Sequence, residues 1–181
     1  LLHKAPHQHE SDPVGDASSR LVGGTYHTHP LFASGGTNDT FDLAVVVLDE
    51  DPGIAPARLP GAGFLDGLVL RDERFVAVGY GTVRDDKTTS FASLSWDPQR
   101  RWAEQGFLSL TKAWLTLSMN PSTGSGGTCY GDSGGPHFLG TSDIVVSITV
   151  TGDRYCRATD KTYRLDTPSA RSFLAGFVTL P

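Results

Sequence analysis

Apolar residues in this chain form short runs separated by glycine- and proline-rich stretches. The first clear run spans residues 41–48, where Asp42 is the one charged interruption near its start. Further runs of the same kind lie at 74–80, 106–110, 114–118, 136–139 and 143–151. Short apolar runs rich in β-branched residues and bounded by turn residues are typical of buried strands. The pattern therefore predicts an all-β protein built from antiparallel strands.

One segment near the end of the chain has a helical period. Thr167 can cap a helix whose first residue is Pro168. Apolar residues then recur on one face at Ala170, Phe173, Leu174 and Phe177. We expect a short C-terminal helix there.

The polar segments divide the chain. Residues 1–20 show no apolar periodicity and predict a loose tail, and 83–102 is polar and predicts a surface excursion. The proline- and glycine-rich stretch 52–67 separates two series of strands, which places a domain boundary after residue 67. We therefore divide the chain into a tail and two structural units, 21–67 and 68–181.

Composition narrows the class of protein. The chain has 181 residues, of which 38% are hydrophobic and 19% charged, an ordinary balance for a globular protein. The net charge of -5, with no lysine or arginine cluster, argues against nucleic acid as a partner. No apolar run approaches the ~20 residues that cross a bilayer. The only methionine is Met119, so we interpret the chain as a processed product or a fragment.

Residues 131–136, Gly-Asp-Ser-Gly-Gly-Pro, carry the clearest chemical signal. Glycines on both sides of Ser133 allow a tight turn whose backbone amides can face an incoming carbonyl, as acyl transfer requires. The letters also fit the nucleophile elbow of α/β-hydrolases, but there an acid and then a histidine follow the serine. Here only His137 follows, so the elbow is excluded. An aspartic-protease tripeptide is a weak alternative, because no hydrophobic strand precedes it.

The hexapeptide resembles the nucleophile loop of the trypsin/chymotrypsin family of serine proteases. Residues 42–46, Asp-Leu-Ala-Val-Val, resemble the strand that carries the family's catalytic acid, and they lie 91 residues before Ser133. The resemblance implies that Ser133 is the nucleophile, Asp42 the triad acid, and the amides of Gly131 and Ser133 the oxyanion hole. Two alternatives stay open: Asp42 as a strand-edge residue bonded to nearby amides, and Asp39 as the acid.

The same resemblance implies a fold of two six-stranded antiparallel β-barrels with the active site between them. Residues 21–67 would then be the remainder of an incomplete first barrel. Residues 68–181 would form the second barrel with the C-terminal helix. Asp132 would be a structural residue that accepts an internal cation, often a freed amino terminus.

The residues around the serine also imply a specificity pocket. The family sets the base of this pocket six residues before the serine, here at Gly127, so trypsin-like selectivity is in doubt. Tyr130 and Thr151 would line the walls. The two cysteines are either buried thiols or one disulfide, and the family's pattern pairs Cys129 with Cys156. An acid from the facing side could come from Asp153 or Asp160.

No histidine in this sequence matches the context of the family's catalytic histidine. The family places it in a small-residue strand, between alanine and cysteine, some forty residues before the acid. None of His3, His7, His9, His27 or His29 has that context. We therefore expect the general base upstream of Leu1. Residues 20–24 resemble an activation site but lie too close to Asp42, and a zinc site at His27 and His29 lacks a third ligand.

Together these features predict a serine endopeptidase that resembles secreted, bacterial-like members of the family. It would act as a monomer on polypeptides, with no cofactor, metal, nucleic acid or membrane. The chain as given would be inactive without its histidine. The alternative is a non-catalytic homologue that acts as a binding module.

Overall fold

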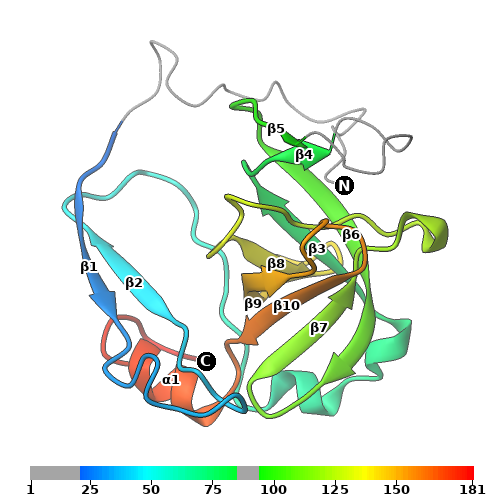
Figure 1. The fold of residues 1–181 in the computed structure, drawn as a ribbon. Helices are drawn as coiled ribbons and strands as arrows, with labels where there is room; N and C mark the ends of the chain where they lie inside the picture. The colour runs from blue at the N-terminus through cyan, green and yellow to red at the C-terminus, as the bar shows by residue number, and fades with distance from the viewer. Residues whose placement is uncertain (1–20, 85–93) are drawn as a thin grey trace.

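The computed structural model describes residues 21–84 and 94–181, and the fold is almost entirely β (Figure 1). Strands β1 (Gly24–Thr28) and β2 (Ala44–Leu48) pair antiparallel as a two-stranded sheet. Short 3₁₀ turns at Phe64–Gly67 and Leu70–Asp72 follow it. The predicted tail, 1–20, lies outside the described residues.

Six strands then close into a barrel. They are β3 (Arg74–Gly79), β6 (Arg101–Leu110), β7 (Trp114–Ser118), β8 (Pro136–Leu139), β9 (Val145–Gly152) and β10 (Thr159–Arg164). Around the barrel the order is β10-β7-β6-β3-β8-β9, and every neighbouring pair is antiparallel. A small hairpin, β4 (Val83–Arg84) with β5 (Leu94–Ser95), and a 3₁₀ turn at Pro121–Thr123 complete the connections.

The predicted strands all appear, and two strands of the barrel differ from the prediction. β6 begins at Arg101, so the last two residues of the predicted surface excursion belong to a barrel strand. β10 was not predicted, because its sequence Thr-Asp-Lys-Thr-Tyr-Arg has only one apolar residue. It nevertheless pairs on both sides, with β7 and β9, and closes the barrel.

The predicted C-terminal helix is α1 (Pro168–Leu174). The hydroxyl of Thr167 accepts a hydrogen bond from the Ala170 amide, so the cap forms as the sequence indicates. Ala170 and Leu174 are buried in a core cluster that also contains Leu43, just before β2, and Tyr163 of β10. The helix thereby fastens the segment that carries Asp42 to the barrel.

The sheet β1–β2 remains open. Every residue of β1 is exposed, and the apolar side chains of Tyr26 and Val46 are 77% and 57% exposed. A two-stranded sheet is marginally stable by itself, so this one depends on its contacts with α1 and the barrel. Of the two barrels that the resemblance implies, the described residues close the second. No helix among them is long and apolar enough to cross a membrane.

The two cysteines form a disulfide, Cys129–Cys156, with their Cα atoms 5.3 Å apart and a sequence separation of 27. This agrees with the pairing that the resemblance implies and excludes the two buried thiols. A loop of this length contributes about 3.5 kcal/mol by restricting the unfolded chain. We expect the Cys129→Ala/Cys156→Ala double variant to lose about that much unfolding free energy in urea denaturation. Reduction of the wild-type disulfide should reproduce the loss, and an unchanged urea midpoint would contradict the assignment.

Candidate active site

Ser133 lies on the loop that leads into β8, and two glycines shape this loop. Gly131 and Gly134 have φ values of 97° and 83°, a region that side-chain-bearing residues rarely adopt. The Gly134 amide donates to the Thr149 carbonyl of β9 at 2.8 Å, and the Gly135 amide donates to the Asp132 carbonyl at the same distance. The loop is therefore fixed to the barrel, and Ser133 is presented on its exposed side.

Two backbone donors at this loop have no acceptor in the described part of the chain. The amides of Gly131 and Ser133 form none of the backbone hydrogen bonds there, and both residues are exposed. The amides between and after them, by contrast, are all paired. Two free donors beside a serine hydroxyl can receive the negative oxygen of a tetrahedral intermediate.

Asp132 is buried, and the hydrogen bonds to its carboxylate hold the serine loop in place. It accepts hydrogen bonds from the Gly81 amide at 2.7 Å and the Cys129 amide at 2.9 Å. Burial raises the pKa of Asp132, and these two bonds partly offset the shift. The resemblance implies an internal cation as its partner. In the described residues its two hydrogen-bond partners are backbone amides instead.

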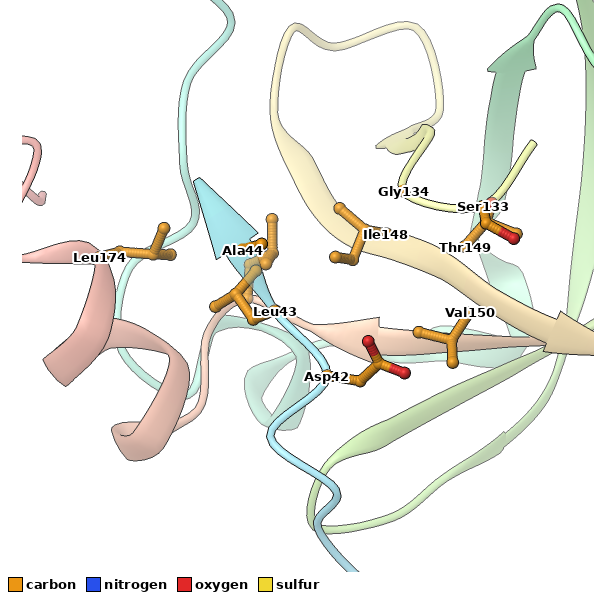
Figure 2. A pocket seen from close by; sticks show the side chains of 10 residues that line it. Asp42, Leu43, Ala44, Ser133, Gly134, Ile148, Thr149, Val150 and Leu174 are labelled. Carbon is orange, nitrogen blue, oxygen red and sulfur yellow. The ribbon is translucent and has the colours of Figure 1, made fainter. Parts of the chain in front are cut away.

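Asp42 and Ser133 line one pocket of about 550 Å³ (Figure 2). Figure 2 shows Asp42 on the segment entering β2 and Ser133 on its loop, with residues of β9 on the wall between them. The lining residues are Asp42, Leu43, Ala44, Ser133, Gly134, Ile148, Thr149, Val150, Leu165 and Leu174. The fold thus brings together two residues that lie 91 positions apart in sequence.

The Asp42 carboxylate is unengaged. Within the described residues it accepts no hydrogen bond, unlike the alternative in which nearby amides hold it at the strand edge. Partial burial raises its pKa. Asp39 differs, because its carboxylate accepts from the Tyr163 hydroxyl at 2.8 Å and the Ser169 hydroxyl at 3.1 Å. Asp39 therefore ties its loop to the barrel and the helix, and only Asp42 is free to orient another group.

No histidine in the described residues lines this pocket. The ring of His27 packs against Phe177, and the ring of His29 packs against Phe41 and Phe173. His137 is fully buried inside the barrel. His3, His7 and His9 lie outside the described residues. The described site accordingly holds a serine hydroxyl, a carboxylate and two unpaired backbone amides, but no imidazole.

A second cavity, of about 200 Å³, opens beside Ser133. Tyr130, Thr151 and both half-cystines line it, as the resemblance implies. The prediction that Gly127 forms the base of the pocket is corrected, because Gly127 is buried but does not line the cavity. A Cβ atom built on Gly127 would lie 2.1 Å from both the Cγ and the Sδ atoms of Met119. Met119 therefore occupies the space beside Gly127 and lines the cavity in place of Gly127. No sequence signal indicated this position of Met119.

The two acids expected near this cavity differ in placement. Asp153 lines it, and its carboxylate accepts from the amides of Tyr155, Arg157, Ala158 and Thr159. Burial alone would raise its pKa, but these bonds outweigh burial and hold the pKa below its ordinary value. Asp160 is fully buried behind the cavity wall. The described residues contain no group of three metal-ligating side chains.

The closed barrel, the glycine-shaped serine loop and the facing acid define a chymotrypsin-like fold. The trypsin family model matches residues 8–174, and the chain belongs to that family. It is similar to two solved structures of human heparin-binding protein. One, a double mutant, has 18% identity and a TM-score of 0.62 over 84% of this chain and 63% of the other. The second, an atomic-resolution structure, has 18% identity and a TM-score of 0.63 over 87% and 66%.

These similarities at 18% identity establish the fold and no more. The chain spans about two thirds of the length of the two neighbours. No curated protein matches.

Proposed function

We propose that this protein is a serine endopeptidase that hydrolyses peptide bonds through an acyl-enzyme on Ser133. The observation that carries the proposal is the shared pocket: Ser133 and an unengaged Asp42 line it together. Two free amides stand at the serine, where the oxyanion would form. A plain glycine turn requires neither the acid nor the free donors.

The reaction follows from these positions. A base removes the proton of the Ser133 hydroxyl while its oxygen attacks the substrate carbonyl, and the carbonyl oxygen becomes negative between the amides of Gly131 and Ser133. The protonated base then gives its proton to the leaving amine, and the acyl group remains on Ser133. Water, activated by the same base, releases the acid product. Asp42 holds the base in its reactive tautomer and stabilises its positive charge.

We propose that the base is an imidazole supplied by a segment upstream of Leu1. The open space of about 550 Å³ between Asp42 and Ser133 is large enough for such a ring. The open sheet β1–β2 lies in the structural unit that ends at residue 67. It would pair with further strands of the first barrel that the upstream segment contributes. Without this segment the chain would be nearly inactive, because losing the histidine of a triad costs on the order of 10⁶ in turnover.

The proposal also concerns the substrate, the compartment and the oligomeric state of the enzyme. Its substrate would be a polypeptide, and it would act outside the cell as a monomer. The disulfide supports an oxidising compartment, and the absence of a basic cluster at a net charge of -5 supports a partner other than nucleic acid.

The second candidate is a non-catalytic binding module. The lack of a histidine in the described pocket favours it, and the two solved neighbours are named for binding heparin. A polyanion is a poor match for this chain, since its net charge is -5 and it has no lysine or arginine cluster. A scaffold alone would also not require a free carboxylate at Asp42.

An active-site phosphonate probe tests the proposal. We expect the probe to leave Ser133 unlabelled in the chain Leu1–Pro181 and to label it in a version extended upstream by the histidine-bearing segment. Phosphonates react only with a serine whose proton has an acceptor. Mass spectrometry of the tryptic peptides locates the label.

Two outcomes decide between the alternatives. Labelling of the short chain would show that one of its own histidines acts as the base. A folded, extended version that is neither labelled nor able to cleave a peptide library would overturn the protease and support the binding module.

A further inference from the structure

The barrel interior contains a carboxylate, Asp160 of β10, that is 0% exposed. Its Oδ2 atom has three partners: Thr128 Oγ1 at 2.8 Å, Gln105 Nε2 at 2.9 Å and His137 Nε2 at 3.0 Å. Burial alone would raise the pKa of Asp160, but His137 and the donated hydrogen bonds outweigh burial and hold the pKa below its ordinary value. Asp160 is therefore ionised near neutral pH, and all three partners donate to it, because a carboxylate only accepts.

The stability of the core does not explain this cluster. A buried charge, even when it is paired, is often no more stable than apolar residues of similar volume. Asp160 Oδ1, Gln105 Oε1 and His137 Nδ1 are also buried without a partner in the described residues, and each such atom costs free energy. Gln105 and His137 are 0% exposed and end inside the barrel. Of the three partners, only Thr128 leads out of it.

Thr128 lies on the segment that enters the serine loop, five positions before Ser133 and outside any helix or strand. Its backbone forms none of the backbone hydrogen bonds in the described part of the chain, so the bond from its hydroxyl to Asp160 is the polar contact that fixes it to the barrel. The amide of the next residue, Cys129, donates to Asp132 Oδ2 at 2.9 Å. The disulfide fixes Cys129 through its side chain, whereas the direction of its amide depends on the planar peptide that it shares with Thr128.

Asp132 transmits this position to the two free amides. It stands between Gly131 and Ser133, and the peptide that joins Asp132 to Ser133 carries one of the two donors. Cys129 holds Asp132 at two points, since its amide donates to the carboxylate and its carbonyl accepts from the Asp132 amide at 3.1 Å. The Gly81 amide holds the other carboxylate oxygen at 2.7 Å. A shift of Cys129 would therefore turn the serine loop about its contact with Gly81.

From this arrangement, and resting on the proposed function, we infer that buried Asp160 is a positioning residue that aims the two oxyanion amides. The connection runs from Asp160 to the Thr128 hydroxyl, along the peptide to the Cys129 amide, and from there to the Asp132 carboxylate. Oxyanion donors are effective only when they point at the place where the negative oxygen forms. A displacement of about 1 Å can cost on the order of 10²-fold in rate.

Thr128→Val tests the connection at its middle, in the upstream-extended enzyme. Valine keeps the shape of the side chain and removes the hydroxyl, while Gln105 and His137 remain to hold Asp160. We expect kcat to fall about 10- to 100-fold, because the oxyanion donors are displaced and not removed. KM should stay near wild type, since these donors act on the transition state. Thr128→Ser keeps the hydroxyl and should restore kcat.

A direct contact between Thr128 and the substrate is the competing explanation, because Thr128 also lines the cavity beside Ser133. Such a contact would change kcat/KM for some substrate side chains and not for others. The oxyanion hole acts on the carbonyl of every substrate, so we expect the same factor across peptides that differ in the residue at the cleaved bond. Asp160→Asn should give a loss in the same range, although Asp160 does not line the cavity.

Thr162→Val is the matched control. Thr162 lies on the same strand as Asp160 and is 0% exposed, and its hydroxyl is hydrogen-bonded to the Leu115 carbonyl at 2.9 Å and to Ser147 Oγ at 2.8 Å. It lines neither the pocket of Figure 2 nor the cavity beside Ser133. The change removes a buried hydroxyl that has no connection to the serine loop. We expect lower stability in urea denaturation and an unchanged kcat.

Amide hydrogen exchange on the chain Leu1–Pro181, followed by NMR, tests the connection without turnover. In the wild-type chain the amides of Cys129 and Gly81 donate to Asp132, whereas those of Gly131 and Ser133 are unpaired. We expect the two paired amides to exchange more slowly than the two unpaired ones. This comparison needs no variant.

The variants then locate the cause. In Thr128→Val and Asp160→Asn we expect the Cys129 amide to exchange about 10- to 100-fold faster, measured relative to the amides of β6 so that a general loss of stability cancels. Thr162→Val should leave this ratio unchanged.

Several results would overturn the inference: a wild-type kcat in Thr128→Val, a loss confined to particular substrate side chains or to KM, an equal loss of kcat in Thr162→Val, or an unchanged Cys129 exchange ratio. The fate of the proposed function is separable. If the extended enzyme is labelled at Ser133 but Thr128→Val keeps its kcat, the protease stands and the positioning role fails. If the extended enzyme is never labelled, the proposed function fails, and the exchange ratio still decides whether Asp160 holds the loop.

Discussion

Replacing Ser133 with alanine is expected to lower the turnover number of the proposed, upstream-extended enzyme by about 10⁶-fold. The serine oxygen is the only protein atom in the proposed mechanism that bonds covalently to the substrate carbonyl carbon, so no neighbouring group can replace it. Ser133 is exposed and its side chain accepts or donates no hydrogen bond within the described residues, so the fold loses nothing by the change. Peptide hydrolysis followed by chromatography gives the turnover number, and urea denaturation gives the stability.

The control is Ser122→Ala, a change at another exposed serine, in the 3₁₀ turn Pro121–Thr123. It removes the same hydroxyl chemistry from a place outside both cavities. We expect wild-type turnover. Residual activity of Ser133→Ala within a factor of about ten of wild type would remove Ser133 from the nucleophile role, since a triad serine is worth far more than that.

The second large effect is expected at Asp42. Asp42→Asn keeps the size of the side chain but replaces the carboxylate, so the imidazole adopts the wrong tautomer and loses the stabilisation of its charge. The corresponding change in a serine protease triad lowers kcat about 10⁴-fold. Because the Asp42 carboxylate accepts no hydrogen bond in the described residues, we expect no loss of unfolding free energy. Steady-state kinetics and urea denaturation measure the two quantities separately.

Asp39→Asn is the matched control, three residues away. Asp39 accepts hydrogen bonds from Tyr163 and Ser169, so the change should lower stability by about 1–3 kcal/mol and leave kcat near wild type. The two variants thus have opposite expected effects. If Asp39→Asn lost turnover and Asp42→Asn did not, Asp39 would be the triad acid.

Much of the barrel could be read from apolar runs because its strands bury apolar side chains on the inner face. β10 is the exception that shows the limit. Its buried side chains include Asp160, Thr162 and Arg164, which form hydrogen bonds with polar partners from other elements. Periodicity of apolar residues cannot find a strand whose interior positions are polar, because their partners come from distant parts of the sequence.

The serine loop was predictable for a different reason. Its glycines adopt φ values that few other residues reach, so the local sequence and the local conformation determine each other. Gly127 could not be understood in the same way. Gly127 has no side chain, and whether this leaves a cavity depends on its neighbours. Met119, directly after β7, fills the space. That is a packing fact between residues that no local rule connects.

The sequence by itself determined the β class, the helix cap at Thr167, the serine turn and the family to which they are similar, because each depends on short-range conformational preference or on a contiguous motif. Only the tertiary structure decided that Asp42 is unengaged and shares a pocket with Ser133, that Asp132 is held by two backbone amides, and that Thr128 donates a hydrogen bond to the buried Asp160. Those facts depend on which distant groups take up each hydrogen bond. The closed barrel determines which distant groups lie within hydrogen-bonding distance of one another, and local sequence patterns do not show this.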